Sequence, residues 1–304
     1  MDAVLQAHFA PRLRAGEPMT RHTSWRVGGP AQAYFEPRDL ADVQALFGQW
    51  PGTGDEVPGD AIHWIGLGSN LLVRDGGIPG LVIASGKAFG EFERIDSAAV
   101  RCGAGLACAQ LARRSAREGL SGGEFFCGIP GTLGGALAMN AGAFGGETWE
   151  VIEAVETIDR AGEVRRRPAA DYRHGYRELH GPQGEWFVAA HLRLQPGSAR
   201  AGAARIRELL ARRAATQPIG QPNAGSVFRN PPGDHAARLI EASGLKGHRI
   251  GEAEISTVHA NFIVNLGGAR ASDIEALMQL AMDRVHAGFG VRLDPEVRVL
   301  GVPA

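Results

Sequence analysis

Short hydrophobic runs alternate along the chain with segments whose apolar residues recur at helical spacing, a pattern typical of mixed α and β structure. Asp39 can cap a helix whose apolar face holds Leu40, Val43, Leu46 and Phe47. Strands are predicted where the apolar runs are short, at 62–65, 81–84, 99–102, 151–159, 163–167 and 186–194. No internal repeat or low-complexity tract interrupts this alternation.

Turn-forming residues divide these elements. Residues 51–60 are rich in Pro, Gly and Asp, which is typical of an exposed loop. Arg160-Ala161-Gly162 separates two strand candidates and predicts a hairpin. Gln195-Pro196-Gly197-Ser198 predicts a domain linker, and an arginine-rich helix is expected beyond it over 201–215.

Two further helices have recognisable ends. Gly119 suits the C-terminal cap of a helix over 106–118. Ser272-Asp273-Ile274-Glu275 matches a capping box and predicts the start of a helix that Gly288 and Gly290 end. The inward face of this last helix is expected to hold Ile274, Leu277, Met278, Ala281 and Val285. A final strand is predicted over 297–300.

Composition narrows the class of protein. A chain of 304 residues can hold two or three domains, and its net charge of −1 provides no general attraction to nucleic acid or anionic membranes. The three cysteines, Cys102, Cys108 and Cys127, lack the spacing of a disulfide framework or a zinc site, and no metal is expected. Without a signal-like or membrane-spanning apolar run, the sequence predicts a soluble protein of the cytoplasm.

Residues 128–146 contain seven glycines and no charged residue. Glycine lets a ligand approach backbone N–H groups closely, because no Cβ stands in the way. Pro130 suits the first position of a helix, whose N-terminal N–H groups would then face a phosphate lying over 128–131. Tight packing between helix and sheet is the alternative, but seven glycines in one run favour a ligand.

A second glycine turn, residues 66–71, directly follows the predicted strand 62–65. Its spacing resembles the start of a dinucleotide fingerprint, but Leu71 stands where the third glycine would fall, so a Rossmann fold is not supported. Ser69 and Asn70 could bind a phosphate or close the turn on themselves. Together, the two glycine segments predict loops that hold one long, doubly phosphorylated cofactor.

Three polar segments are candidates for chemistry. Ser226 lies beside a glycine in the segment 223–231, although such a serine more often bonds its own turn. Arg173 lies in an aromatic and cationic cluster over 171–177; such clusters are usually solvent-exposed, but they also suit a carboxylate or phosphate. Glu296 enters the final strand, where an acid is more often structural.

In this order and spacing, the segments resemble one family from about residue 21 to residue 301. The carriers are 23–31, 66–72, 128–145, Tyr172-Arg173, 224–231, 258–265 and 295–297. The chain is similar to the UDP-N-acetylenolpyruvoylglucosamine reductases, flavoenzymes of bacterial peptidoglycan precursor synthesis. The resemblance implies an α+β fold, with a two-part FAD-binding module of the PCMH/VAO type followed by a smaller α+β substrate domain. The implied domains are 1–70 with the strand 297–304, 71–198, and 199–296.

The resemblance also implies a cofactor and its site. FAD would bind non-covalently, with its pyrophosphate held by the backbone of the two glycine segments. The implied cofactor-binding residues are Gly66, Leu67, Gly68, Ser69, Asn70, Leu71, Gly128, Ile129, Pro130, Gly131, Thr132, Gly134, Gly135, Asn140 and Gly142. NADPH would reduce the flavin, leave, and be replaced by UDP-N-acetylglucosamine enolpyruvate. A monomer without nucleic-acid or membrane partners is expected.

In this family, hydride passes from flavin N5 to the terminal vinyl carbon and leaves an enolate-like charge on the substrate. Ser226 matches the proton donor, and Arg173 and Glu296 match the residues that stabilise and orient the intermediate. Because a carboxylate beside an anion is unfavourable, Glu296 is expected to act protonated or through a water that reprotonates Ser226. The implied substrate-binding residues are Tyr172, Arg213, Asn223, Arg229 and Phe262.

The chain departs from the family pattern at several positions. Gly175 replaces a common serine, Met139 and Phe144 replace Gln and Tyr, and Arg229 replaces a lysine while it keeps the charge. About thirty residues separate Leu194 from Ser226, too few for the tyrosine-bearing lid of the longer subclass. The chain therefore resembles the shorter type.

Two other interpretations stay open from the sequence. A flavin oxidase or dehydrogenase of hydroxy acids or polyols would share the cofactor, but many of these tether FAD through a histidine, and the two glycine segments contain none. A catalytically silent binder of flavin or nucleotide sugar would have no need of Ser226, Arg173 and Glu296 at the matching places.

Overall fold

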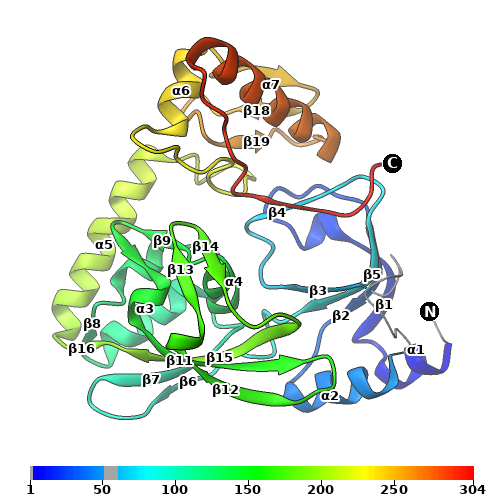
Figure 1. Ribbon diagram of the computed structural model, residues 1–304, viewed down its shortest axis with the longest axis vertical. Coiled ribbons are helices and arrows are strands. Elements are labelled where there is room, and N and C mark those ends of the chain that lie inside the picture. The colour runs from blue at the N-terminus through cyan, green and yellow to red at the C-terminus, as the bar shows by residue number, and fades with distance from the viewer. Residues whose placement is uncertain (1–2, 51–60) are drawn as a thin grey trace. The chain divides into compact units, whose positions relative to one another are not determined.

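The computed structural model describes residues 3–50 and 61–304 (Figure 1). Contacts divide the chain into two compact units, each assembled from three separate segments. Unit 1 contains Met1–Arg14, Tyr34–Leu67 and Val82–Arg213, and unit 2 contains Ala15–Ala33, Gly68–Leu81 and Ala214–Ala304. The three-domain division at residues 70 and 198 stays a prediction. Within the described ranges, no helix combines the length and apolarity needed to cross a membrane.

Seven α-helices are described, together with four 3-10 turns. The helices are α1 Ala3–Phe9, α2 Leu40–Gln49, α3 Cys108–Arg117, α4 Leu133–Ala138, α5 Ala199–Thr216, α6 Ala236–Ala242 and α7 Ala271–Phe289. The turns are η1 Met19–Arg21, η2 Glu124–Gly128, η3 Thr148–Val151 and η4 Ala169–Asp171.

The strands form small sheets and one larger one. They are β1 Leu13–Pro18, β2 Pro30–Phe35, β3 Ile62–Ile65, β4 Leu71–Val73, β5 Ile78–Ala84, β6 Phe92–Arg94, β7 Ala99–Gly103, β8 Leu120–Ser121, β9 Gly142–Ala143, β10 Gly146–Glu147, β11 Ile152–Asp159, β12 Val164–Pro168, β13 Arg173–Gly175, β14 Glu178–His180, β15 Glu185–Arg193, β16 Gln195–Pro196, β17 Arg249–Ile250, β18 Ala253–Ile255, β19 Ile263–Asn265 and β20 Arg298–Leu300. The sheet orders are β1-β2-β5-β3, β12-β11-β15-β7-β6 and β17-β18-β19, with pairs β9–β10, β13–β14, β8–β16 and β4–β20.

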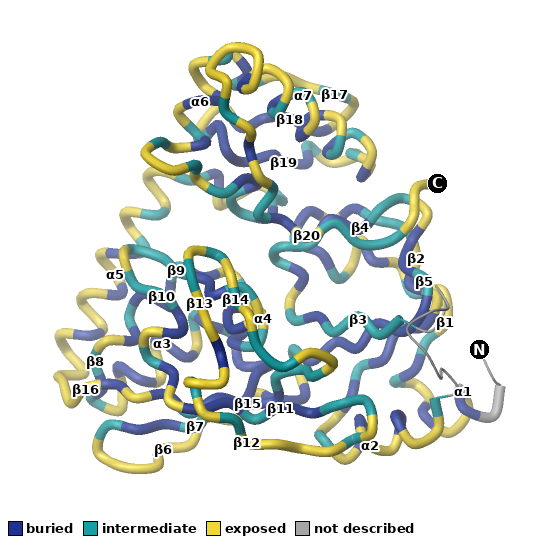
Figure 2. Tube along the Cα trace, in the orientation of Figure 1, coloured by how far each residue is buried: buried dark blue, intermediate teal, exposed yellow. Residues whose placement is uncertain are grey.

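Unit 1 is built on the five-stranded antiparallel sheet. Its strands β7, β11 and β15 contribute buried apolar residues, and α3, α4 and η2 supply Leu111, Leu133 and Phe126 to the same core (Figure 2). The predicted hairpin is confirmed, because β11 and β12 pair antiparallel across residues 160–163. The three cysteines are buried free thiols in this core.

Unit 2 is built on β17-β18-β19, with α6 and α7 beside this sheet (Figure 1). The predicted inward face of α7 is confirmed, since Ile274, Leu277, Met278, Ala281 and Val285 are all buried. Trp25 is fully buried here, and its indole Nε1 donates to the Ile263 carbonyl at 2.7 Å. The fold of unit 2 therefore joins residues 15–33 to the last ninety residues.

Several local predictions are confirmed and others shift by a few residues. Asp39 caps α2 by accepting from the Asp42 N–H at 2.9 Å, and Gly119 follows α3 with a φ of +70°. α7 begins at Ala271 rather than after Ser272, because Asp273 accepts from the Arg270 N–H at 2.9 Å and closes the box two residues earlier. The expected loop over 51–60 lies outside the described residues.

The segment predicted as a domain linker is a paired strand. Gln195 and Pro196 form β16, which pairs antiparallel with β8 inside unit 1. The Gly197 N–H also donates to the Gly119 carbonyl at 2.7 Å. Its turn-forming residues had suggested a linker, but these backbone hydrogen bonds hold the segment to the end of α3.

Candidate active site

Gly66, at the start of the first glycine segment, lies against Thr132 of the second segment within unit 1. A Cβ built on Gly66 would collide with Thr132 Oγ1 and would lie 3.2 Å from its Cγ2, so only glycine permits this approach. The contact joins the turn after β3 to the segment before α4. Two loops that are more than sixty residues apart in the sequence therefore lie side by side, as the hypothesis of one shared ligand requires.

The helix after Pro130 starts later than predicted. Thr132, not Ile129, is the N-cap of α4, and its hydroxyl accepts from the Gly135 N–H at 3.4 Å. Residues 131–133 instead run beside 106–108: the Cys108 N–H donates to the Gly131 carbonyl and the Leu133 N–H to the Leu106 carbonyl, both at 2.9 Å. Pro130 and Gly131 therefore lie before the helix.

This pairing decides which backbone donors remain for a ligand. The Gly134 N–H donates to the Ala104 carbonyl at 2.7 Å and is therefore not available to a ligand. Within residues 3–50 and 61–304, no backbone or side-chain acceptor takes the N–H of Gly131 or Thr132. The same holds for the N–H of Leu67 in the first turn. Donors are therefore still available in both segments, although the first turn of α4 supplies fewer than expected.

Most glycines of the second segment are explained by packing. A Cβ on Gly134 would lie 3.0 Å from the Ala104 Cβ, one on Gly128 would lie 2.8 Å from the Ala143 Cβ, and one on Gly142 would lie 2.6 Å from the Gly146 carbonyl oxygen. Gly135 differs, because only Thr132 Oγ1 comes within 4 Å, at 3.7 Å. Gly135 is also exposed, so packing within the chain gives no reason for glycine there.

Asn140 is fully buried and points into unit 1. Its Nδ2 donates to Glu147 Oε2 at 2.8 Å and to the Gly175 carbonyl at 2.9 Å, while its Oδ1 accepts from the Trp149 N–H at 3.0 Å. Both amide hydrogens are thereby used within the protein. A contact of this side chain with the cofactor stays a prediction. In the structure, Asn140 supports β13 through its hydrogen bond to Gly175.

Ser226 lies in a tightly turned segment of unit 2. Gly225 has a φ of +77°, which favours glycine, and its N–H donates to Asn223 Oδ1 at 2.9 Å. The Asn223 Nδ2 donates to the carbonyls of Pro218 and Gln221, so this predicted substrate-binding side chain holds its own loop. Ser226 is half-buried, and among the described residues its Oγ makes no hydrogen bond.

Glu296 lies beside this serine in the fold of unit 2. The Glu296 N–H donates to the Val227 carbonyl at 2.8 Å, and the Asn70 Nδ2 donates to the Glu296 carbonyl at 3.0 Å. Asn70 belongs to the first glycine turn. Hydrogen bonds therefore join that turn, the final strand and residues 223–231, which we call the serine segment. Two of the three predicted catalytic residues are therefore neighbours.

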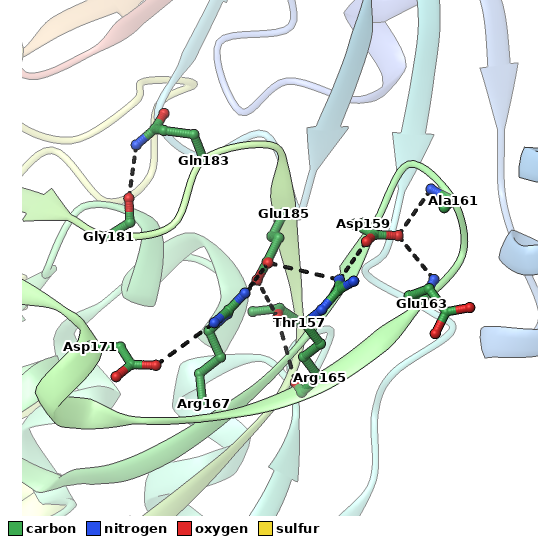
Figure 3. Close-up of polar contacts among 10 residues, drawn as sticks. All are labelled: Thr157, Asp159, Ala161, Glu163, Arg165, Arg167, Asp171, Gly181, Gln183 and Glu185. Atoms are coloured by element: carbon green, nitrogen blue, oxygen red, sulfur yellow. Dashed lines mark hydrogen bonds and ion pairs between the residues drawn. The ribbon is translucent and has the colours of Figure 1, made fainter.

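The third, Arg173, begins β13 in unit 1 and is exposed. Tyr172 before it is buried, with its ring 4.7 Å from that of Trp149, and burial raises the pKa of Tyr172 to about 12. Figure 3 shows Arg167 between Glu185 and Asp171: its Nε donates to Glu185 at 2.8 Å, and its Nη1 lies 3.8 Å from Asp171. These contacts fix the segment that precedes Arg173.

The remaining predicted substrate-binding residues differ in exposure. Arg229 pairs with Asp294 at 3.2 Å and remains partly exposed. Arg213 lies in α5, where burial lowers the pKa of its guanidinium. Phe262 is buried at 3 % exposure with its ring 4.8 Å from that of His259, so it packs inside unit 2. A contact of Phe262 with substrate stays a prediction.

Sequence reasoning gave no role to Asn261. This residue is buried beside the serine segment, and its side chain exchanges two hydrogen bonds with the backbone of Phe228. The signal in the sequence was an Asn inside an apolar run, four residues before a second Asn in the same run. Such a side chain must find buried partners, but the sequence does not say which.

These residues fit FAD in their chemistry. The loops that meet at Gly66 and Thr132 keep unspent N–H donors, which suit a pyrophosphate, and Gly135 leaves space beside them. Leu67 is half-exposed at the same turn and offers apolar surface to a ring system.

Comparisons with known proteins agree with this fit. A family model described as FAD binding domain matches residues 31–167, and one described as UDP-N-acetylenolpyruvoylglucosamine reductase, C-terminal domain, matches residues 217–300. The fold and these matches define an FAD-dependent oxidoreductase, which confirms the predicted fold class and cofactor.

The relatives narrow the class to one family. UDP-N-acetylenolpyruvoylglucosamine reductase of Alkalilimnicola ehrlichii is 56% identical over 95% of each chain, and that of Nitrosococcus oceani is 53% identical over 100% of each. A crystal structure of the Thermus caldophilus enzyme superposes with a TM-score of 0.78 at 35% identity, over 95% of this chain and 98% of that one. The chain belongs to the UDP-N-acetylenolpyruvoylglucosamine reductase family, and the predicted resemblance is confirmed.

Proposed function

We propose that this chain reduces UDP-N-acetylglucosamine enolpyruvate to UDP-N-acetylmuramate with NADPH and FAD, in peptidoglycan precursor synthesis. Family membership supports this reaction. The observation that carries it within the chain is the serine segment: Ser226 keeps a hydroxyl without a hydrogen-bond partner in the described residues, directly beside the backbone of Glu296. The silent-binder and hydroxy-acid oxidase interpretations do not account for this pair.

The proposed roles follow from the charge that the reaction creates. When bound, FAD supplies the hydride that it has received from NADPH. Ser226 then donates its proton to the substrate carbon next to the carboxylate. This carbon of the enolate-like intermediate is basic enough to take the proton in a site from which water is excluded. Arg173 stabilises the developing negative charge, and one well-placed donor contributes about 3 kcal/mol to such a step. Glu296 orients the intermediate and returns a proton to Ser226.

The finer expectations belong to the same proposal. We propose that the protein acts as a monomer in the cytoplasm, with neither nucleic acid nor membrane as partner; the net charge of −1 supports this. Light scattering behind a sizing column checks the monomer. A stable dimer at micromolar concentration would contradict that part alone.

The experiment that tests the function separates the two half-reactions by stopped flow. Ser226→Ala should leave the reduction of bound flavin by NADPH near the wild-type rate, because no proton from the serine is needed there. Its reoxidation by the enolpyruvyl sugar nucleotide should fall by roughly 10²–10⁴-fold, the usual contribution of a positioned proton donor.

Ser243→Ala is the matched control, since that hydroxyl donates to the Leu239 carbonyl inside α6. Equal losses in both halves for Ser226→Ala would remove its assigned role. Wild-type flavin that is reoxidised only by oxygen or by a hydroxy-acid couple would contradict the reaction itself.

A further inference from the structure

We propose that Asn261 is a positioning residue of the reductive step, which fixes the backbone that presents Ser226. The inference rests on the proposed function, because it assigns Asn261 an effect on proton donation. It concerns unit 2 alone and needs no contact between Asn261 and a ligand.

Asn261 binds the serine segment through three hydrogen bonds. Its backbone carbonyl accepts from the Val227 N–H at 2.9 Å. Its Oδ1 accepts from the Phe228 N–H at 3.0 Å, and its Nδ2 donates to the Phe228 carbonyl at 2.8 Å. Asn261 is 4 % exposed and Phe228 is 2 % exposed, so water cannot replace these bonds. Removing the amide would leave a buried donor and a buried acceptor without partners.

The opposite edge of the same segment is held by the residues around Glu296. Val227 accepts from the Glu296 N–H, Phe228 bridges to Pro295, and the Arg229 N–H donates to the Asp294 carbonyl at 2.8 Å. Residues 227–229 thus lie between two partners like a short central strand. On one side the partner is backbone, and on the other it is largely the amide of Asn261.

Only an amide side chain can serve as such an edge, because it offers a donor and an acceptor about as far apart as those of a peptide group. Aspartate lacks the donor when it is ionised, and alanine lacks both groups. On the N-terminal side, Ser226 follows Gly225, which adopts a φ of +77° and has no Cβ to restrict its backbone. The position of Ser226 therefore depends on how firmly Val227 and Phe228 are held.

The first test is the half-reaction split of Asn261→Ala. Flavin reduction by NADPH should stay within about twofold of wild type, whereas reoxidation by the enolpyruvyl sugar nucleotide should fall by up to roughly 100-fold, the cost of a misplacement near 1 Å. Asn261→Asp keeps the volume and the acceptor but loses the donor, and it should slow the same half-reaction. It also serves if the alanine variant does not fold.

Asn265→Ala is the matched control. Asn265 is buried in the same apolar run, and its side chain donates to the Trp25 carbonyl at 2.9 Å and accepts from the N–H groups of Gly267 and Ala269. Its loss should lower stability and leave the ratio of the two half-reaction rates near wild type. If both Asn variants change that ratio equally, Asn261 is merely structural.

Two measurements separate positioning from general damage. Amide hydrogen exchange of the variant without flavin should accelerate at Phe228, and at Glu296 across the segment, while β18 keeps its protection. In a double-mutant cycle, Asn261→Ala should slow reoxidation little further once Ser226→Ala is present, because both act on one group.

Additive losses in that cycle, or unchanged exchange at Phe228, would overturn the assignment of Asn261. Failure of the proposed function has a different signature, namely wild-type flavin that the enolpyruvyl sugar nucleotide does not reoxidise. The two failures are therefore distinguishable.

Discussion

The two glycines in the first turn of α4 differ in the space that surrounds them, and this difference separates their roles. Gly134 has Ala104 against it and its N–H is spent on a carbonyl, so it is glycine for the sake of the fold. Gly135 has room for a methyl group and is exposed. A residue that the protein itself does not require to be glycine is the better candidate for a contact with FAD.

Gly135→Ala should therefore weaken FAD binding without harming the flavin-free protein. Alanine in a helix is favoured over glycine by about 1 kcal/mol, so the apoprotein should be equally or more stable. Flavin content after purification and the Kd of re-added FAD measure the first effect, and thermal unfolding measures the second.

Gly134→Ala provides the contrast. Its methyl group would press on Ala104, so this variant should unfold at a lower temperature even without flavin. Unchanged FAD affinity in Gly135→Ala would mean that Gly135 does not face the cofactor.

His259 is a single residue that should make the stability of the fold depend on pH. Burial lowers the pKa of His259 below its ordinary value of 6.5, since the charged imidazolium loses solvation there; Lys246 lowers it further and Glu241 opposes this. The neutral ring accepts from the Asn261 N–H through Nδ1 at 3.3 Å.

Because the unfolded chain takes up this proton first, stability is fully present above pH 6.5 and declines as pH falls through the lowered pKa. Urea unfolding at pH 7.5 and 5.5 should thus show a smaller decline for His259→Gln than for wild type. The exposed His235→Gln is the control, and an identical decline in His259→Gln and wild type would disprove the effect.

At the scale of elements, the start of α7 shows what local sequence can and cannot reveal. The apolar spacing predicted its inward face correctly, because helical periodicity is a local property. Its cap was misplaced, because the N–H groups of Ala271 and Ser272 are satisfied by Asp75, 196 and 197 positions away. No local motif announces an acceptor from so distant a segment.

The cap makes a quantitative prediction. Asp75→Ala should cost about 1–2 kcal/mol of unfolding free energy, the usual loss for an N-terminal cap, because two first-turn donors lose their acceptor. Chemical denaturation measures it. Ser272→Ala is the matched control for the capping residue expected from sequence, and a larger loss there than in Asp75→Ala would restore the local box.

The candidate site follows the same division. Ser226, Arg173 and Glu296 stay predictions, which the sequence allowed because the short segments around them match the pattern of the family. The contact of Gly66 with Thr132 and the clamp of Asn261 on Phe228 were not predicted, since each joins residues far apart in the chain. Likewise, the paired strand Gln195–Pro196 looked like a linker because its partner β8 lies 74 residues away.

At the scale of the whole molecule, β20 stands out because it pairs with the strand at the end of the first glycine turn. It pairs in parallel with β4, which directly follows that turn, and the Arg74 N–H donates to the Leu300 carbonyl at 2.9 Å. Beyond the strands, the Gly76 N–H donates to the Val302 carbonyl at 3.0 Å. Residues 298–302 therefore hold β4 and the residues that follow it, Arg74 and Gly76.

Deleting residues 298–304 should leave β4 without this partner and abolish flavin retention, whereas deleting only 303–304 should preserve it. Absorbance near 450 nm per mole of purified protein measures retention, and circular dichroism reports whether the rest remains folded. A yellow, NADPH-bleachable protein after the longer deletion would show that β20 is dispensable for the cofactor.

The pairing of β4 with β20 also bears on how the cell makes the holoenzyme. Asn70 and Glu296, which hydrogen-bond, are 226 positions apart, so a ribosome has to synthesise both before the turn acquires its native neighbours. FAD can then bind only late in the synthesis of the protein, and nascent chains stalled midway through translation would be colourless.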